Sequence, residues 1–499
     1  MNSFFSRKCI ASLLLLATLV GTALPLLSSC DGAAPATETK TVASTEETGT
    51  GETAPATKEK ERPNVAKGVI PEEKNLVLQM EKIPIANSSM TEDQLRDIIL
   101  QFMKLQLTFA YTPDLGDRED YGYYISAISD AYDVNINDES IDNCKVTFQE
   151  EKYYGGIFYC GQTHGSVYRW LPFYDAETGI MDFEPIINSR RINYKDKWPD
   201  GGSGIFGNSC SSAVFWAFCR VSNKLTSCWT AHWSPKYGFV KVGDFTLSEN
   251  DTISGDSDQI ASKNGSQKMY RAYAQVQKAD GLVHSGHAIM AVEDAHVEYH
   301  PNGTIDGENS YIIFCEQKAS FLTGSPEDGG VDLSYPLNDS GAVYRVQGNF
   351  PGTCTREKWN FSYLYSKGWF PFTIPELAGL DPVEDPVVEI NHEGDTIKYS
   401  ALRSKAITAN YIISDIHLTV TDRSGKECFT GMYAVPSGGA EALWRVGLNT
   451  ALYSNTLYGN KGHIGWNLSE YTNGNYTLNI DCRISTGALI RVYSGTLVE

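Results

Sequence analysis

The stretch from residue 31 to about residue 75 contains almost no side chain that a folded core could bury. It consists mainly of Thr, Ala, Glu, Pro, Gly and Lys (DGAAPATETKTVASTEETGTGETAPATKEKERPNVAKG). Such a segment cannot offset the conformational entropy lost on folding, because it has too little apolar surface to remove from water. We therefore expect a flexible tether over residues 30–75 and a fold that begins at residue 76.

The residues before this tether have the pattern of an export signal. Arg7 and Lys8 supply positive charge, residues 10–27 are nearly all apolar, and the small residues of LSSC lead to Cys30. This segment resembles the signal peptide of a bacterial lipoprotein, in which the cysteine is lipidated and becomes the first mature residue. The resemblance implies a signal peptide over 1–29, lipidation at Cys30 and a position outside the cytoplasm, anchored to the cell membrane. The alternative is an uncleaved anchor helix, because the apolar run is nearly long enough to span a bilayer.

The charge balance argues against nucleic acid as a partner. Lys and Arg number 41 and Asp and Glu number 61, so the formal net charge is -20. Nucleic-acid binding depends on neutralising phosphates, which an acidic chain does poorly. No C-x-x-C pair occurs, and residues 133–144 (DVNINDESIDNC) lack the glycine and the final glutamate that a calcium-binding EF-hand loop requires. We expect no metal and no cofactor.

The cysteine count allows disulfides without assigning them. Of the 11 cysteines, Cys9 would leave with the signal peptide and Cys30 would be lipidated, so an odd number remains. At least one mature thiol is then unpaired within the chain. Cys428 and Cys482 lie in the same C-terminal region and are candidates for a disulfide in an oxidising compartment.

Two folded regions are expected after the tether. Thr91 and Gln94 have the spacing of a capping box, and a stripe of apolar residues follows at helical spacing (Leu95, Ile98, Ile99, Phe102 and Met103). Between about 150 and 375, short apolar runs alternate with Gly, Asn and Asp, which is typical of mixed α and β structure. The acidic, proline-containing stretch LDPVEDPVVEI indicates a linker. We assign residues 76–380 to one α+β domain and residues 381–499 to a second domain.

The second domain has the alternation of antiparallel strands. Ile416, Leu418 and Val420 share one face of a predicted strand, and Tyr476, Leu478 and Ile480 share one face of another. No helical pattern is evident in this region. It resembles the immunoglobulin-like modules of bacterial surface proteins, which implies a C-terminal β-sandwich.

The segment NSCSSAVFWAF contains the candidate nucleophile. A helix beginning at Cys210 would be capped by Asn208 and Ser209. It would bury one stripe of residues (Ala213, Val214, Ala217 and Val221). The positive end of a helix dipole lowers the pKa of a thiol and favours the reactive thiolate. The alternative is an inert packed thiol, because free cysteine is among the most buried residue types.

A cysteine nucleophile requires a base and a group that orients the base. His287 begins an alternating apolar strand in GHAIMAVEDA, and His284 is the rival on the preceding turn. The next predicted strand ends in Glu316 and Gln317, and either could orient the imidazole. Since neighbouring residues of a strand point to opposite faces, only one of these two should reach it.

Four motifs that surround these residues occur in a recognisable order: NSCSSAVFWAF, KADGLV, GHAIMAVEDA and GTIDGENSYIIFCEQ. Together they resemble the papain-like cysteine amidases and peptidases of bacterial walls, most of all the CHAP group (cysteine, histidine-dependent amidohydrolase/peptidase) and its NlpC-type relatives. The resemblance implies a papain-like α+β domain with an N-terminal helical extension. It also implies that Cys210 is the nucleophile, that His287 is the base, and that Glu316 orients the base.

These expectations favour a membrane-tethered, extracytoplasmic cysteine amidase or peptidase. Its substrate would be a cell-wall peptide or another extracellular peptide or amide, cleaved through an acyl-enzyme. One alternative is a non-catalytic surface lipoprotein that binds a ligand or partner through the same two domains. Another is a thiol enzyme of transglutaminase type, which would incorporate amines instead of hydrolysing amides.

Overall fold

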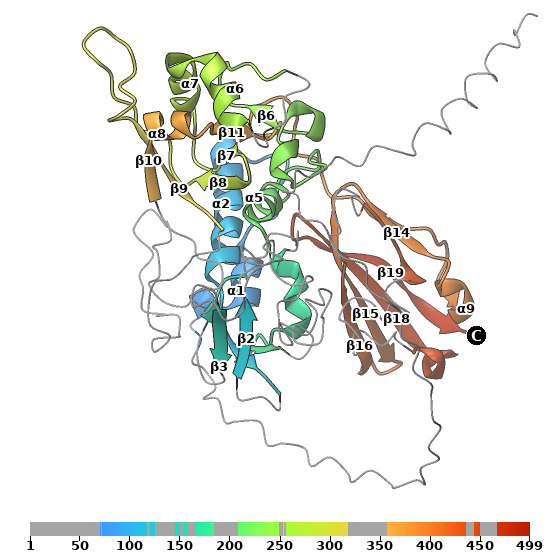
Figure 1. The fold of residues 1–499 in the computed structure, drawn as a ribbon. Helices are drawn as coiled ribbons and strands as arrows, with labels where there is room; N and C mark the ends of the chain where they lie inside the picture. Colours follow the sequence, from blue (N-terminus) through green and yellow to red (C-terminus); the bar gives the residue numbers. More distant parts are fainter. Residues whose placement is uncertain are drawn as a thin grey trace, which may run out of the picture. The chain divides into compact units, whose positions relative to one another are not determined.

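The computed structural model (Figure 1) describes residues 70, 72–116, 120–124, 145–149, 154–157, 166–183, 208–248, 253, 256–317, 357–435, 444–449 and 467–499. All of them belong to the unit Pro63–Glu499. The predicted signal peptide, the lipidation site Cys30, nearly all of the tether and the stretch 133–144 lie outside the described residues. Within the described part of the chain, no helix has the length and apolar character needed to cross a bilayer.

The first long helix begins where the capping box predicts. Among the described residues the α-helices are α1 (Leu76–Lys82), α2 (Glu92–Thr108), α5 (Cys210–Phe218), α6 (Ser257–Asn264), α7 (Ser266–Tyr273), α8 (Phe361–Ser366) and α9 (Tyr399–Leu402). Before α2, the backbone N–H of Gln94 donates to Thr91 Oγ1 at 3.3 Å, and the N–H of Thr91 donates to Gln94 Oε1 at 2.9 Å. The predicted apolar stripe of this helix is buried, which confirms its structural role.

The largest sheet is antiparallel throughout and has six strands. Its order is β10 (Glu357–Asn360), β9 (Tyr311–Cys315), β8 (His287–Ala291), β7 (Gly281–His284), β11 (Phe370–Thr373) and β6 (Val240–Lys241). Helix α5 contacts both α2 and β8 (Figure 1). The side chain of Gln106 on α2 donates to the backbone oxygen of Ala213 on α5 at 3.0 Å. The sheet and α2 therefore hold α5 between them.

Gly281 explains how closely the region after α5 approaches the sheet. A Cβ atom at this position would lie 2.6 Å from the ring of Trp233 and 3.3 Å from the ring of Phe218. Only a residue without a side chain permits this contact between two aromatic rings and strand β7. The glycine of the KADGLV motif therefore has a packing role.

The remaining strands form smaller sheets. One has the order β4 (Tyr154–Gly155), β1 (Ala110–Asp114), β5 (Ile180–Asp182), and another pairs β2 (Asp120–Tyr124) with β3 (Lys145–Gln149). In the C-terminal region, a three-stranded sheet has the order β12 (Val388–Ile390), β14 (Ala406–Ala409), β17 (Arg445–Gly447). A five-stranded sheet has the order β13 (Thr396–Lys398), β19 (Leu489–Val498), β18 (Asn473–Ile484), β15 (Ile413–Asp422), β16 (Glu427–Ala434).

The predicted fold class is wrong. We expected a papain-like α+β domain with an N-terminal helical extension, followed by an immunoglobulin-like β-sandwich. The described chain is instead mostly β-sheet with few helices, and its strands are divided among separate sheets of two to six strands. Strands β1, β2 and β3 follow α2 before residue 150, where the helical extension was expected. Local alternation reveals strands, but their partners lie far apart in the sequence, so it does not reveal how the strands are grouped.

The C-terminal region departs from the predicted pattern in two ways. It was expected to be antiparallel and free of helix, yet β13 and β19 pair in parallel and α9 lies between β13 and β14. The predicted inward faces are largely correct, since Ile416, Leu418, Val420, Leu478 and Ile480 are buried and Tyr476 is half-buried. Alternation within a strand is a local property, and for that reason it could be predicted.

The suggested disulfide between Cys428 and Cys482 is also wrong, because both are free cysteines. Cys482 on β18 lies opposite Ile416 and is buried, whereas Cys428 on β16 is exposed. The two strands are separated by β15 in the five-stranded sheet.

Candidate active site

Helix α5 places the thiol of Cys210 at its first residue. Ser209 is the N-cap: the backbone N–H of Ser212 donates to its Oγ at 3.3 Å, and its own N–H donates to Ser212 Oγ at 2.9 Å. This reciprocal pair is a capping box, and it ends the preceding extended backbone at the residue before Cys210. The helix therefore starts where the sequence predicts. It differs from the prediction in being buried on all sides and not along one stripe.

The base and its partner come from neighbouring strands. His287 is the first residue of β8, and its Nε2 lies 2.5 Å from Oε2 of Glu316, which follows β9 directly. The His287 side chain is 20% exposed, whereas that of Glu316 is 1% exposed. A carboxylate this deeply buried is held by its hydrogen bond to the imidazole, which fixes the orientation of the ring.

Strand register explains why Glu316 reaches His287 and Gln317 does not. Met290 pairs with Cys315, so continuing the register places Glu316 opposite Ile289, on the same face of the sheet as His287. Gln317 points to the other face, where its Nε2 donates to the backbone oxygen of Ile157 at 2.7 Å. Of the two candidates, the structure brings Glu316 to the imidazole.

The sulfur of Cys210 lies beside the start of β8. It donates to the backbone oxygen of Gly286 at 3.9 Å, and it is close enough to His287 for the imidazole to lower the pKa of the thiol. Gly286 has φ +81°, a conformation that glycine adopts without strain, and the turn that it makes joins β7 to β8. Because Nε2 of His287 is bonded to Glu316, Nδ1 is the ring nitrogen available to the thiol. The structure thus brings together the three residues Cys210, His287 and Glu316 from α5, β8 and the end of β9.

The charges of this trio act on one another. Burial opposes ionisation of Cys210, but the charge of His287, its hydrogen bond and the backbone N–H groups of Ala288 and Ser211 together lower the pKa of the thiol. Burial likewise opposes protonation of His287, but Cys210 and Glu316 outweigh it and raise the pKa of the imidazole to about 10. Both shifts favour the ion pair, a thiolate beside an imidazolium, over a neutral thiol beside a neutral imidazole.

The rival histidine has the opposite character. Burial, the charge of His287 and the charge of Lys367 lower the pKa of His284 to about 4. Its ring centroid is 6.2 Å from that of His287 and 4.1 Å from that of Trp369. His284 is therefore neutral where His287 is charged, and no hydrogen bond is recorded between it and the thiol of Cys210.

The other described cysteines do not share the environment of Cys210. Burial raises the pKa of Cys219, the residue after α5, well above its ordinary value, and raises that of Cys228 to about 12. Burial also raises the pKa of Cys482. Burial therefore has the opposite outcome in these three thiols from that in Cys210, whose pKa is lowered. Cys210 is also largely enclosed, being 3% exposed.

Trp369 is a site neighbour that no sequence pattern predicted. It is 1% exposed, and its ring centroid is 5.9 Å from that of His287. Trp369 comes directly before β11, whose Phe370 pairs with Val283 on β7. A tryptophan so far along the chain reaches the site only through this strand pairing. Predicting Trp369 as a neighbour of His287 would have required knowing that β11 pairs with β7.

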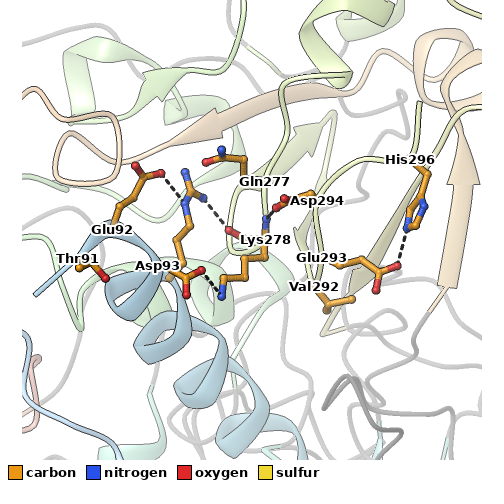
Figure 2. A pocket seen from close by; sticks show the side chains of 10 residues that line it. Thr91, Glu92, Asp93, Gln277, Lys278, Val292, Glu293, Asp294 and His296 are labelled. Atoms are coloured by element: carbon orange, nitrogen blue, oxygen red, sulfur yellow. Dashed lines mark hydrogen bonds and ion pairs between the residues drawn. The ribbon is translucent and has the colours of Figure 1, made fainter. Parts of the chain in front are cut away.

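The residues that line a polar groove (Figure 2) do not include any of the three site residues. It has a volume of about 700 Å³ and is lined by Thr91, Glu92, Asp93, Arg96, Gln277, Lys278, Val292, Glu293, Asp294 and His296. Its cations are already paired: Arg96 with Asp280 at 2.9 Å, and Lys278 with Asp93 at 2.6 Å. The groove connects the start of α2 to the segments that flank β7 and β8.

The chemistry open to the site is nucleophilic attack. A thiolate held beside an imidazolium adds to electrophilic carbon, and the backbone N–H of Cys210 at a helix start is placed to donate to a developing oxyanion. Comparisons of the chain with family models, with curated proteins and with solved structures gave no match.

Proposed function

We propose that this protein is a membrane-tethered, extracytoplasmic cysteine amidase or peptidase that acts on cell-wall peptides. The observation that supports this most is the line of contacts from Cys210 through His287 to Glu316, in which a buried thiol has a lowered pKa. Burial alone would raise that pKa, so the lowered value requires the charged imidazole. A thiol that only filled space would not need such a partner.

The reaction follows from these three groups. The thiolate of Cys210 attacks the amide carbonyl carbon, and the resulting oxyanion receives a hydrogen bond from the backbone N–H of Cys210. The imidazolium of His287 gives its proton to the leaving amine as the C–N bond breaks, which leaves a thioester. His287 then takes a proton from water, the hydroxide adds to the thioester, and the carboxylic acid product leaves as the thiolate reforms. Glu316 holds the ring in place and stabilises its charge.

The cellular setting rests on the N-terminal expectations. A chain lipidated at Cys30 and carrying a flexible tether of residues 30–75 would place its folded part roughly 35 to 40 Å from the membrane by a random-coil estimate. Wall peptides are abundant amides within that reach. The resemblance of the site motifs to CHAP and NlpC-type enzymes supports the same substrate class. It contributes the chemistry of the site and not the fold.

A non-catalytic surface lipoprotein is the second candidate. The enclosure of Cys210, which is 3% exposed, is the observation in its favour, because a nucleophile must meet its substrate. In this alternative the trio is a buried polar network that stabilises the junction of α5 with the sheet.

The deciding experiment compares wild type with Cys210→Ala on purified cell wall, with the released fragments identified by mass spectrometry. We expect new amide cleavages in the wild type and none in the variant. Cys219→Ala is the matched control, because it removes a buried thiol from the other end of the same helix and should leave the pattern unchanged. Identical patterns for wild type and Cys210→Ala would exclude hydrolysis at this site. Incorporation of an added amine in place of hydrolysis would indicate transglutaminase chemistry.

A further inference from the structure

His284 and His287 face each other across the two-residue turn between β7 and β8. They are the last register pair of that hairpin, so their relative position is set by the backbone. The ring of His284 packs edge-on against Trp369, and the ring of Trp369 in turn contacts His287 at 5.9 Å. The imidazole that contacts Cys210 thus has two aromatic neighbours in addition to Glu316.

Trp369 is fixed by contacts on several sides. Its backbone N–H donates to the oxygen of Leu364 at 3.0 Å, and its backbone oxygen accepts from the hydroxyl of Tyr273 at 2.8 Å. Its ring is 5.4 Å from that of Trp359 on β10. The hairpin is also tied to α6, since the N–H of Ser285 donates to Ser257 Oγ at 3.2 Å. Neither neighbour of His287 can shift without disturbing the helices around it.

The electrostatic surroundings of His284 are cationic. The groups that act on it are His287 on β8 and Lys367 in the segment between α8 and β11, and each disfavours a positive charge on His284. Burial also disfavours its charged form, so the pKa falls to about 4. Hydrogen bonds and ion pairs between His284 and a carboxylate are absent from the described contacts. A charge on His284 would repel the imidazolium of His287 across the hairpin.

We propose that His284 and Trp369 are positioning residues that hold the His287 ring between Cys210 and Glu316, and that they do so only while His284 is uncharged. The proposal rests on the proposed function, because it assigns these residues to the same nucleophilic site. Trp369 supplies the fixed surface against which both rings pack. His284 fills the position across the turn without adding a charge beside the imidazolium.

The test measures alkylation of Cys210 by iodoacetamide in the native protein from pH 4 to pH 9, followed at this cysteine by peptide mass spectrometry. It needs no substrate, so it reads the thiolate directly. The variants at the hairpin are His284→Phe and His284→Lys, and those at the tryptophan are Trp369→Phe and Trp369→Leu. His296→Lys is the matched control, because His296 also stacks on an aromatic ring, that of Tyr311 at 4.5 Å, but lines the separate groove.

The expected results separate charge from shape. His284→Lys should slow alkylation about tenfold at pH 6, since a fixed cation beside the imidazolium favours the neutral thiol–imidazole pair over the reactive ion pair. His284→Phe should stay within about twofold of wild type at pH 6. It should also lose the extra fall in rate that wild type shows as pH drops toward 4. Trp369→Leu should slow the reaction about tenfold, and Trp369→Phe should restore most of the rate.

The labelling experiment distinguishes failure of the proposed function from failure of the roles proposed for His284 and Trp369. If wild-type Cys210 is not alkylated faster than an ordinary thiol at pH 6, the proposed function loses its premise. If wild type reacts rapidly and His284→Lys has the same profile as His296→Lys, the role of His284 is wrong while the proposed function stands. If Trp369→Leu reacts like wild type, the same conclusion holds for Trp369. Circular dichroism of each variant identifies any that fail to fold, and Trp369→Phe then carries the test at that position.

Discussion

Two histidines in this protein donate to buried carboxylates in nearly the same way, and only one of them has a thiol beside it. His287 pairs with Glu316, with side chains 20% and 1% exposed, and His417 pairs with Asp415, with side chains 19% and 0% exposed. Both bonds use Nε2 of the imidazole. Burial and hydrogen bonding alone therefore do not distinguish the candidate site from the C-terminal pair.

The difference lies in what surrounds each pair. Asp415 also accepts from Arg483 Nε at 3.3 Å, so its charge is shared with a cation on the neighbouring strand. Cys482 is in the same sheet, but it lies opposite Ile416 and so faces away from His417. A histidine–carboxylate pair becomes a candidate site only when a nucleophile lies beside the other ring nitrogen, as Cys210 at the first residue of α5 does beside His287. In the C-terminal sheet the same pair serves stability.

The largest expected contrast is between the two cysteines. Cys210→Ala should abolish amide cleavage, a loss of at least about 1,000-fold, because no other group replaces the nucleophile. Cys482→Ala should leave cleavage unchanged and lower stability by about 1 kcal/mol through the small cavity that it opens. Cleavage is measured by mass spectrometry of wall fragments, and stability by urea unfolding. Equal activity of the two variants would remove the distinction.

The next largest contrast is between variants of His287 and His417 in the rate of Cys210 alkylation. His287→Asn should slow alkylation of Cys210 at pH 6 by about 100-fold, because the thiol loses the cation that lowers its pKa. His417→Asn should leave that rate within about twofold of wild type. The measurement is iodoacetamide labelling quantified at Cys210. A comparable loss in both variants would mean that the effect is transmitted through folding.

Variants of the two carboxylates, Glu316 and Asp415, should separate reactivity at the candidate site from stability of the C-terminal sheet. Glu316→Gln should lower the pKa of His287 from about 10 and slow alkylation about tenfold, with little change in the far-ultraviolet spectrum. Asp415→Asn should leave the rate unchanged but cost about 2 kcal/mol of stability, because Arg483 and His417 lose a buried acceptor. The labelling rate should therefore change in Glu316→Gln, and the urea midpoint should change in Asp415→Asn.

The pH dependence of stability provides a fourth test, measured as the difference between wild type and the double variant Cys210→Ala/His287→Ala. The raised pKa of His287 contributes stability that is complete below pH 6.5 and is lost as pH rises to about 10. The lowered pKa of Cys210 contributes stability that is complete above pH 9 and is lost as pH falls. Just below pH 9 the two slopes oppose each other, so the difference should be nearly flat there, and above pH 9 it should fall by at most about 1.4 kcal/mol per pH unit. A steady rise across this range would contradict the ion pair.

The smallest expected effects concern the two capping boxes. Ser209→Ala and Thr91→Ala should each destabilise the protein by about 1 kcal/mol in urea unfolding, since each removes an N-cap acceptor. Only Ser209→Ala should also slow alkylation of Cys210, by a fewfold, because only that cap positions the helix start that bears the thiol. Equal labelling rates in both variants would mean that the cap holds the helix without tuning its first residue.

The elements predicted from sequence are those specified by neighbouring residues. Ser209 followed by Cys210 and an apolar run marked the start of α5, and Thr91 with Gln94 marked the start of α2. The residue pattern alone left Glu316 and Gln317 as alternatives, and only the family resemblance favoured Glu316, because the choice depends on how β9 is registered against β8. Local pattern locates a strand and gives its two faces, whereas its partner is set by packing of the whole chain.

The fold class failed for that reason. β11 pairs with β7 on one side and with β6 on the other, and the residue pattern within each strand does not predict either pairing. Trp369 was missed as a consequence, because it reaches His287 only when β11 is in place. Strands β1, β2 and β3 were also not predicted, since a short run such as AYTPD is too short to show a periodicity.

The strand order of the large sheet has a consequence for biogenesis. A nascent chain emerges from its N-terminus, so the thiol at 210 appears first, its base at 287 later, and the strand between β7 and β6 last of all. Pairings this distant in sequence are slow to form, because loop closure must precede them. The sulfur therefore remains an ordinary unactivated thiol through most of synthesis. The polypeptide acquires its reactive group only after β8 and β9 have paired and α5 has packed against them.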